Sequence, residues 1–484
     1  MTTRDDLKRL ARCLPTGALL TSVEEMRPYE CDGFSPCRRL PRAVALPENE
    51  QQVQAVLKFC HQARIPVVPR GAGTGLSGGA LPVEEGIVLS LARLNRIIAI
   101  DPVDRCARVQ PGVRNLAISE AAAPYGLHYA PDPSSQLACT IGGNVAENSG
   151  GVHCLKYGLT THNLLELRWI SADGEVMTVG GTGLEGPGYD VLALLTGSEG
   201  LLGVIVEIVV RLLPIPPHAR VLLASFETIE TAGAAVAGII AAGIVPAGLE
   251  LMDNASIRAT EAFVGAGYPV DAAAIILCEL DGLTEQVETD LERVRAVLAA
   301  QGALSVRVSH DEAERRRFWA GRKAAFPAVG RIAPDYYCMD GTIPRRHLAV
   351  VLRRIGELAA AHGLAVANVF HAGDGNLHPL ILFDANQPGQ LEQAEALGGR
   401  ILETCIAVGG TITGEHGVGV EKINSMCLQF GHDELLQFHA VRQAFDPDGL
   451  LNPGKAIPTL NRCAEFGAMH VHGGQTLYPD LEHF

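Results

Sequence analysis

The sequence predicts an α+β protein with two main domains, and three observations support this prediction. The chain has 484 residues, more than one hydrophobic core usually organises. Short β-prone runs, helical periodicity and glycine-rich loops follow one another without the regular strand–helix alternation of a parallel α/β fold. A proline cluster, Pro214, Pro216 and Pro217, ends the β-prone run over residues 204–213 and marks the boundary between the domains.

The first domain is predicted over residues 38–217, after a lead-in over residues 1–37 that begins as a helix. A helix is expected over residues 48–63 because the apolar residues recur there at helical spacing. The strands expected with it are 43–47, 65–69, 87–91, 97–100, 105–109 and 204–213.

The second domain is predicted over residues 218–456, and a tail over residues 457–484 follows it. Strands are expected at 221–225, 248–253 and 273–279, and helices at 229–242, from residue 255 onward and at 284–301. This order of elements favours an antiparallel sheet with helices on one face, and the last third of the chain is predicted to be mostly helical.

Composition excludes several classes of function. Lys and Arg total 39 against 54 for Asp and Glu, and this net charge of -15 argues against nucleic-acid binding. The twelve cysteines are scattered without a Cys-x-x-Cys pair, which favours free thiols in a reducing compartment and no iron–sulfur cluster in this chain. The stretch over residues 232–249 is rich in Ala and Gly and lies between Glu230 and Glu250, so we expect a buried helix and turn in a soluble protein, with no membrane span.

Residues 70–79 form a glycine-rich loop in which Gly73, Gly75 and Gly78 fit the G-x-G-x-x-G pattern. A dinucleotide-binding turn of that kind needs a helix directly after it, but Pro82 and the strand at residues 87–91 leave no room for one. The loop instead offers backbone N–H groups that are able to wrap a diphosphate. On this loop alone, a plain glycine-rich turn is an equally good interpretation.

Three further segments extend the pattern: Pro131-Asp132-Pro133-Ser134-Ser135 with the run over residues 140–151, then residues 156–158, then residues 197–205. Together with the loop they resemble the FAD-binding domain of the p-cresol methylhydroxylase (PCMH) and vanillyl-alcohol oxidase flavoproteins. The resemblance implies that the loop cradles the pyrophosphate, that Thr140–Gly143 lies against the flavin, and that the strand after Gly203 contacts the adenine side.

By position, the residues that this resemblance implies for FAD binding are Pro69, Arg70, Gly71, Ala72, Gly73, Thr74, Gly75, Leu76, Ser77, Gly78, Pro131, Asp132, Ser135, Thr140, Gly142, Gly143, Asn144, Asn148, Gly150, Gly151, Tyr157, Gly158, Glu199, Gly200, Gly203, Val204, Ile205 and Asn452. Some members attach the flavin covalently through a histidine near the first loop. No histidine lies between His61 and His128 here, so the resemblance implies non-covalent FAD.

Residues 366–383 contain two apolar β-prone runs around Asp374-Gly375, the preferred centre of a type I′ hairpin turn. Pairing across such a two-residue turn sets His371 opposite His378 on one face, as two ligands of a divalent metal. Two histidines that cap a turn are the alternative. The loop over residues 411–419 adds Glu415 and His416, and a His, His, Glu set with open coordination positions favours metal binding, with zinc, manganese or iron as candidates.

These segments resemble the C-terminal domain of the FAD-linked D-lactate, D-2-hydroxyglutarate and glycolate dehydrogenases. The resemblance implies a PCMH-type FAD-binding domain, a ferredoxin-like α+β substrate (cap) domain and a helical C-terminal segment. It implies that His371, His378 and Glu415 bind the metal, that His416 is the catalytic base, and that Arg322, in Phe318–Arg322, holds the substrate carboxylate. Residues 445–447 and 452–455 match the closing motif near the flavin.

Phe326, Cys338 and Leu380 stand where the D-2-hydroxyglutarate enzymes place polar or basic residues. A five-carbon diacid would leave a charge unpaired there, so the sequence favours glycolate or D-lactate, oxidised to the 2-oxo acid. The alternatives are a D-lactate or D-2-hydroxyglutarate dehydrogenase that acts alone, and a flavin electron-transfer subunit with its substrate chemistry on a partner. A metal-dependent hydrolase would have no use for the FAD motifs.

Members that act on glycolate work with a second flavin subunit and an iron–sulfur subunit that pass electrons toward the respiratory chain. The resemblance therefore implies a cytoplasmic protein that reaches the inner membrane only through its complex. The tail, with Phe466, Met469, Tyr478 and Phe484, is expected either to dock on a partner or to pack on the chain's own surface.

Overall fold

The computed structural model describes residues 3–183, 186 and 188–459, so the predicted tail lies almost wholly outside the described residues. The chain divides into two compact units: unit 1 is Met1–Ser149, Leu159–Pro214 and Glu415–Phe484, and unit 2 is Gly150–Gly158 and Ile215–Gly414. The chain passes from unit 1 to unit 2 between Pro214 and Ile215, within the predicted proline cluster. The units do not follow the predicted linear division, because residues 415–456 belong with the first unit and residues 150–158 with the second.

Unit 1 contains a mixed sheet of the order β1-β2-β4-β3, with β1 Leu19–Leu20, β2 Ala43–Ala45, β3 Val67–Arg70 and β4 Ile87–Ser90. Strands β2, β4 and β3 are parallel and β1 is antiparallel. The helices of this part are α1 Thr3–Ala11, α2 Val23–Met26, η1 Arg27–Tyr29 and α3 Glu50–Ala63. Helix α3 begins at the Asn49 cap, which accepts a hydrogen bond from Gln52 N, and it buries Val53, Val56, Leu57 and Cys60 at helical spacing.

The second sheet of unit 1 is antiparallel, with the order β5-β6-β10-β8-β9. Its strands are β5 Ile97–Asp101, β6 Cys106–Val109, β8 Leu164–Ile170, β9 Val176–Gly180 and β10 Val204–Arg211, and β7 Leu127–His128 pairs with β11 Leu213–Pro214. The remaining helices of the unit are α4 Asn115–Ala122, η2 Ala123–Tyr125, α5 Ile141–Glu147, η3 Thr160–Asn163, α7 Val191–Leu195, α15 Met426–Gln429 and α16 His432–Phe445. The end of α16 packs on this part of unit 1 through the Phe445 ring, 5.6 Å from that of Trp169.

Unit 2 contains one antiparallel sheet of the order β15-β12-β14-β13-β17-β18-β16. Its strands are β12 His218–Phe226, β13 Gly248–Asp253, β14 Ala274–Gly282, β15 Ser305–Val308, β16 Asp335–Cys338, β17 Ala365–Phe370 and β18 Pro379–Phe383. Its helices are α6 Cys154–Tyr157, α8 Ile229–Ala241, α9 Asn254–Val264, α10 Thr284–Ala300, α11 Glu312–Lys323, α12 Ala325–Val329, η4 Arg345–His347, α13 Leu348–His362 and α14 Gln390–Ala407.

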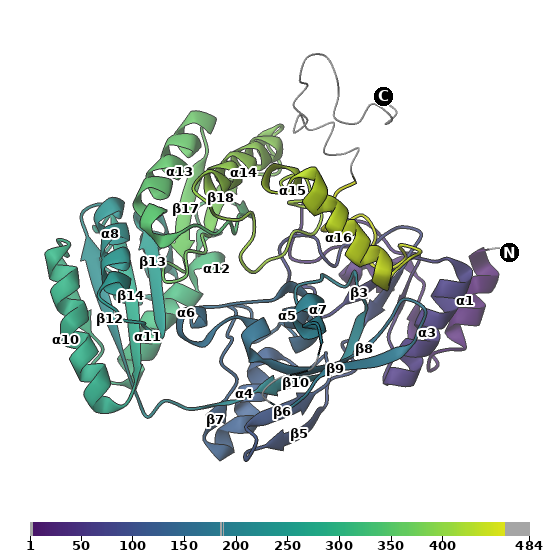
Figure 1. Ribbon diagram of the computed structural model, residues 1–484. Coiled ribbons are helices and arrows are strands. Elements are labelled where there is room, and N and C mark those ends of the chain that lie inside the picture. Colours follow the sequence, from purple (N-terminus) through teal and green to yellow (C-terminus); the bar gives the residue numbers. More distant parts are fainter. Residues whose placement is uncertain (1–2, 184–185, 187, 460–484) are drawn as a thin grey trace. The chain divides into compact units, whose positions relative to one another are not determined.

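The helices of unit 2 form two groups that cover both faces of the sheet, which corrects the expectation of a single helical face. Helices α10, α8, α13 and α14 pack side by side along the sheet, and α8 and α10 lie beside β12, β13 and β14 in Figure 1. Helices α9, α11 and α12 form the second group. Strands β13 and β14 are buried almost throughout, as expected for strands covered on both faces rather than on one.

The described residues include no helix long and apolar enough to cross a membrane. Among the described residues ten cysteines are free thiols, and Cys60, Cys278 and Cys405 are among the buried ones.

Candidate active site

Strands β17 and β18 form the predicted hairpin, but its register differs from the predicted one. The ladder pairs Asn368 with Pro379 and continues through a bridge between His371 and Asn376, so the connecting loop has four residues rather than two. A type I′ turn needs positive φ at both central residues, and only Gly375 adopts it, with φ of 87°. The N–H of Gly375 instead donates to the His371 carbonyl at 3.1 Å and closes the wider turn.

His371 and His378 therefore lie diagonally across the hairpin rather than directly opposite each other. Because the offset is two residues, both side chains still project from the same face. Their rings meet edge to face, with centroids 4.9 Å apart. The two histidines thus lie close together but not directly opposite, so the predicted pairing is wrong, and their role as metal ligands stays a prediction.

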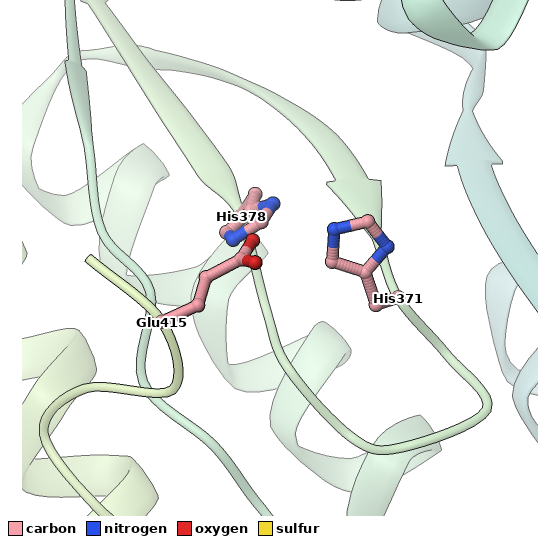
Figure 2. A group of neighbouring side chains, drawn as sticks. All are labelled: His371, His378 and Glu415. Carbon is pink, nitrogen blue, oxygen red and sulfur yellow. The ribbon is translucent and has the colours of Figure 1, made fainter. Parts of the chain in front are cut away.

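Glu415 completes a three-residue group with these histidines, as Figure 2 shows. The ligand atoms of His371, His378 and Glu415 all lie within 4.8 Å of one another. Glu415 directly follows Gly414, whose N–H donates to the Asp340 carbonyl at 2.8 Å at the end of unit 2. The Glu415 side chain is only 10% exposed. The donor set of two imidazoles and a carboxylate fits a divalent metal with open coordination positions.

A buried ion pair connects this group with the predicted carboxylate-binding arginine. Arg322 and Glu250 are each 1% exposed, and Arg322 Nη2 lies 2.7 Å from Glu250 Oε2. The other oxygen, Glu250 Oε1, lies 2.9 Å from His371 Nδ1. Burial alone would raise the pKa of Glu250, but the interactions with His371 and Arg322 outweigh it and hold that pKa below its usual value. The sequence interpretation did not include Glu250 in the site.

The loop after Glu415 is fastened within unit 1 by two residues that the resemblance assigned to FAD. Both carboxylate oxygens of Glu199 accept backbone N–H groups at 2.7 Å, from Val418 and from Gly419. Ser77 Oγ donates to the His416 carbonyl at 2.9 Å, and the Ser77 carbonyl accepts the N–H groups of Val420 and Glu421. Burial raises the pKa of Glu199, and these two N–H donors oppose the shift. Ser77 and Glu199 thus hold the loop that carries Glu415 and His416.

Most of the predicted FAD-binding segments come together in unit 1. A Cβ on Gly71 would lie 2.5 Å from Thr140 Oγ1, and a Cβ on Gly200 would touch the Pro69 ring, so these backbones pack without space for side chains. Asn452 Nδ2 donates to the carbonyls of Gly79 and Glu199 and joins the closing motif to both loops. Val204 and Ile205 begin β10 directly after Gly203.

Two details of this region fit a bound cofactor. Thr140 Oγ1 is buried and has no hydrogen-bond partner among the described residues. A Cβ on Gly75 or Gly143 would meet nothing closer than 3.9 or 3.7 Å, so the backbone is open on that side. Arg70 is different, because its guanidinium donates to the Cys31 carbonyl at 2.8 Å and supports the loop from within the protein.

Other predicted FAD residues have protein partners or lie in the other unit. The Asn144 side chain pairs with Asn115, and Asn148 Oδ1 accepts the N–H of Thr161. Gly150, Gly151, Tyr157 and Gly158 belong to unit 2, where the Tyr157 hydroxyl donates to Asp281 at 2.6 Å. Pro131 accepts a hydrogen bond from Asn115 through its carbonyl, beside Asp132 and Ser135. The contact of these residues with FAD stays a prediction.

Comparison with known proteins places the chain in a family. A model described as "FAD linked oxidases, C-terminal domain" matches residues 215–456, and one described as "FAD binding domain" matches residues 41–180. The chain belongs to the FAD-linked oxidases. This membership confirms FAD as the cofactor of the predicted oxidoreductase.

Two relatives and one solved structure define its place among FAD-linked oxidases. The chain is 65% identical over 478 residues to the glycolate oxidase subunit GlcD of Escherichia coli strain K12, covering 99% of this chain and 96% of that protein. It is 34% identical over 452 residues to a D-lactate dehydrogenase of Archaeoglobus fulgidus, covering 90% and 98%. A structure of p-cresol methylhydroxylase with substrate bound shares the fold at 18% identity, with a TM-score of 0.79 over 95% of this chain and 97% of that one.

The hairpin geometry predicts the effect of Gly375→Ala. A Cβ at this positive-φ position would overlap the Ile343 carbonyl oxygen, so the turn between His371 and His378 must move. We expect a loss of stability of about 1–3 kcal/mol together with weaker metal binding, measured by thermal unfolding and by metal analysis. Gly356→Ala, in α13 with open space around the new Cβ, is the control and should stabilise the chain by about 0.5–1 kcal/mol. Unchanged metal content in Gly375→Ala would contradict the role of the turn.

Proposed function

We propose that this FAD-linked oxidase oxidises glycolate, and also D-lactate, to the 2-oxo acid with non-covalently bound FAD. One observation carries the proposal: the group of His371, His378 and Glu415 is connected through Glu250 to Arg322. A 2-hydroxy acid has an anionic carboxylate beside a hydroxyl, and this arrangement offers a cation for the first and a metal site for the second. The relatives named for glycolate and D-lactate support the substrate class.

The surroundings of His378 support a short substrate. The Phe326 ring lies edge-on to the His378 ring, with centroids 6.1 Å apart. Cys338 and Leu380 are paired in the ladder between β16 and β18, and both are buried. A second carboxylate near these apolar side chains would lose its hydration without gaining a partner. Glycolate, whose product is glyoxylate, and D-lactate avoid this cost.

Each protein residue has a defined task in the proposed reaction. Arg322 pairs with the substrate carboxylate, and His416 accepts the proton of the 2-hydroxyl group. Glu415 and the two histidines would hold a divalent zinc, manganese or iron ion, which lowers the pKa of the hydroxyl group. FAD supplies the acceptor for the hydride that leaves C2. Ser77 and Glu199 keep His416 in place through the backbone of its loop.

We further propose that electrons leave through a second flavin subunit and an iron–sulfur subunit at the inner membrane. The name of the Escherichia coli relative, which describes a subunit, supports this assignment. The scattered cysteines offer no cluster of ligands for an iron–sulfur centre in this chain.

The metal ligands predict a specific pattern of loss. His371→Ala, His378→Ala and Glu415→Gln should each release most of the metal and abolish flavin reduction by glycolate, while FAD stays bound. Metal analysis, flavin absorbance and single-turnover reduction measure the three properties. His362→Ala, which removes a histidine of α13 outside the group, should change none of them. Wild-type turnover in the ligand variants after chelation would make the group structural.

Arg322→Lys tests the carboxylate site. An ammonium group does not reproduce the planar fork of donors, so we expect KM for glycolate to rise about 10- to 100-fold, the equivalent of losing one hydrogen bond to a charged group. The turnover number should also fall, because the substrate is held less firmly for hydride transfer. Steady-state kinetics with glycolate measure both values. Unchanged kinetics would place the substrate carboxylate elsewhere.

The proposed partner subunits lead to a prediction about which acceptor reoxidises the flavin of the isolated chain. Glycolate added in the absence of oxygen should bleach the flavin. An artificial dye should then reoxidise the flavin much faster than oxygen does, since the proposed acceptor is a partner subunit and not oxygen. Stopped-flow absorbance and a peroxide assay measure the two routes. No bleaching by any 2-hydroxy acid would favour a flavin electron-transfer subunit. Rapid peroxide production would contradict the partner assignment.

A further inference from the structure

Glu250 lies between His371 and Arg322, and each of its two carboxylate oxygens contacts one of these side chains. Its Oε1 lies 2.9 Å from His371 Nδ1, and its Oε2 accepts a hydrogen bond from Arg322 Nε at 2.8 Å. We propose that Glu250 is a positioning residue that sets the metal-binding orientation of His371 and the substrate-binding orientation of Arg322 together. This inference rests on the proposed function and adds a residue to it.

The fold places Glu250 next to His371 through strand pairing. Strands β13 and β17 pair Leu251 with Phe370 and Met252 with Val369. Continued by one residue, the same register sets Glu250 opposite His371, and the Gly373 N–H reaches the Leu249 carbonyl at 2.9 Å just beyond. Directly opposed residues of an antiparallel pair project from the same face. The contact therefore follows from the sheet itself and not from a flexible loop.

Glu250 determines which nitrogen of His371 is available to a metal. A carboxylate only accepts hydrogen bonds, so Nδ1 must carry the hydrogen and Nε2 must carry the lone pair. In Figure 2 one ring nitrogen of His371 is turned toward His378 and Glu415, and the other is turned away. Metal-binding histidines commonly donate their second nitrogen to a carboxylate in this way, which fixes the ring and raises its basicity.

The same carboxylate orients the guanidinium of Arg322. Nε and Nη2 both lie on Glu250 Oε2, at 2.8 and 2.7 Å, so one edge of the planar group is held. Nη1 is buried and has no hydrogen-bond partner among the described residues. The free edge is the one that a substrate carboxylate would occupy. Removal of the Glu250 charge would leave a buried cation without compensation and free to reorient.

Strand β14 supplies a matched control in Glu279. This residue is 3% exposed, and its carboxylate accepts two hydrogen bonds from Arg315 Nη1 at 3.0 Å and lies 3.5 Å from His153 Nε2. It thus combines a buried glutamate of the same sheet with an arginine of α11 and a histidine at the start of α6, and none of the three belongs to the proposed site. Loss of its charge should affect folding stability alone.

The test compares Glu250→Gln with Glu279→Gln in the full-length FAD-loaded protein, reconstituted with zinc. Both variants should unfold at a lower temperature than the wild type. Only Glu250→Gln should bind zinc about 10- to 100-fold more weakly in a chelator competition and show a raised KM for glycolate. Glu279→Gln should keep the wild-type zinc affinity and KM. If Glu250→Gln also keeps both, Glu250 is merely structural and the inference is wrong.

A measurement on the wild-type protein covers the case in which Glu250→Gln does not fold. Nitrogen-15 NMR of histidine-labelled, zinc-loaded protein should show His371 with hydrogen on Nδ1 and zinc on Nε2, its signal assigned by loss in His371→Ala. The opposite arrangement would overturn the inference. A wild-type protein that binds no zinc would instead refute the proposed metal site. Zinc binding that is unchanged in Glu250→Gln refutes only the role of this residue.

Discussion

The buried charge of Arg322 sets the main constraint on unit 2. An arginine of helix α11 that is 1% exposed where it packs on the sheet is tolerated only with a hydrogen-bonded negative charge beside it, and Glu250 supplies that charge. The pair does not stabilise the folded state relative to apolar residues of similar volume, which pack at least as well. The proposed function gives the pair a role in recognition: the arginine keeps one edge available for a substrate, and the same Glu250 carboxylate contacts His371. Under the proposed function, strand β13, which is otherwise apolar up to Asp253 at its end, carries the charge of Glu250 for the site.

The second constraint lies in unit 1, where a loop with little secondary structure must keep two reactive side chains in place. The residues after Glu415 and His416 form no helix or strand until α15, yet their N–H groups are matched to Glu199 and to the Ser77 carbonyl. Glu199 itself has a φ of 50°, an unusual conformation for a residue with a side chain. Strain of this kind persists where surrounding contacts enforce it. The glycine-rich loop thus has an open backbone side at Gly75 and holds the loop after Glu415 through Ser77.

Local sequence patterns predicted those helices and strands whose limits depend on interactions between residues near in sequence. Helix α3, strand β13 and helix α10 lie within a few residues of their predicted limits, because apolar spacing defines them and, for α3, the Asn49 cap does so too. The hairpin register was missed because Asp374 does not take positive φ, and the turn widens to satisfy the Gly375 N–H. Glu250 was interpreted as the flank of an apolar stretch, since its partners are distant in sequence. His371 meets it through the pairing of β13 with β17, and Arg322 meets it from helix α11. The resemblance supplied the proposed metal ligands, and the pairing of β17 with β18 explains why the two histidines among them meet.

The balance of charge in the site bears on which substrates it accepts. With a divalent ion bound as proposed, that ion and Arg322 bring three positive charges, and Glu250 and Glu415 bring two negative ones. One surplus positive charge remains, which a monocarboxylate neutralises and a dicarboxylate overcompensates. Without the ion the surplus is negative, and the protein as a whole carries a net charge of -15. An acidic chain therefore attracts an anionic substrate only through charges concentrated at this one place. Loss of the proton of the 2-hydroxyl group to solvent would leave the occupied site with a net negative charge. In the proposed reaction His416, whose Nε2 lies 4.0 Å from Glu415 Oε1, accepts that proton instead.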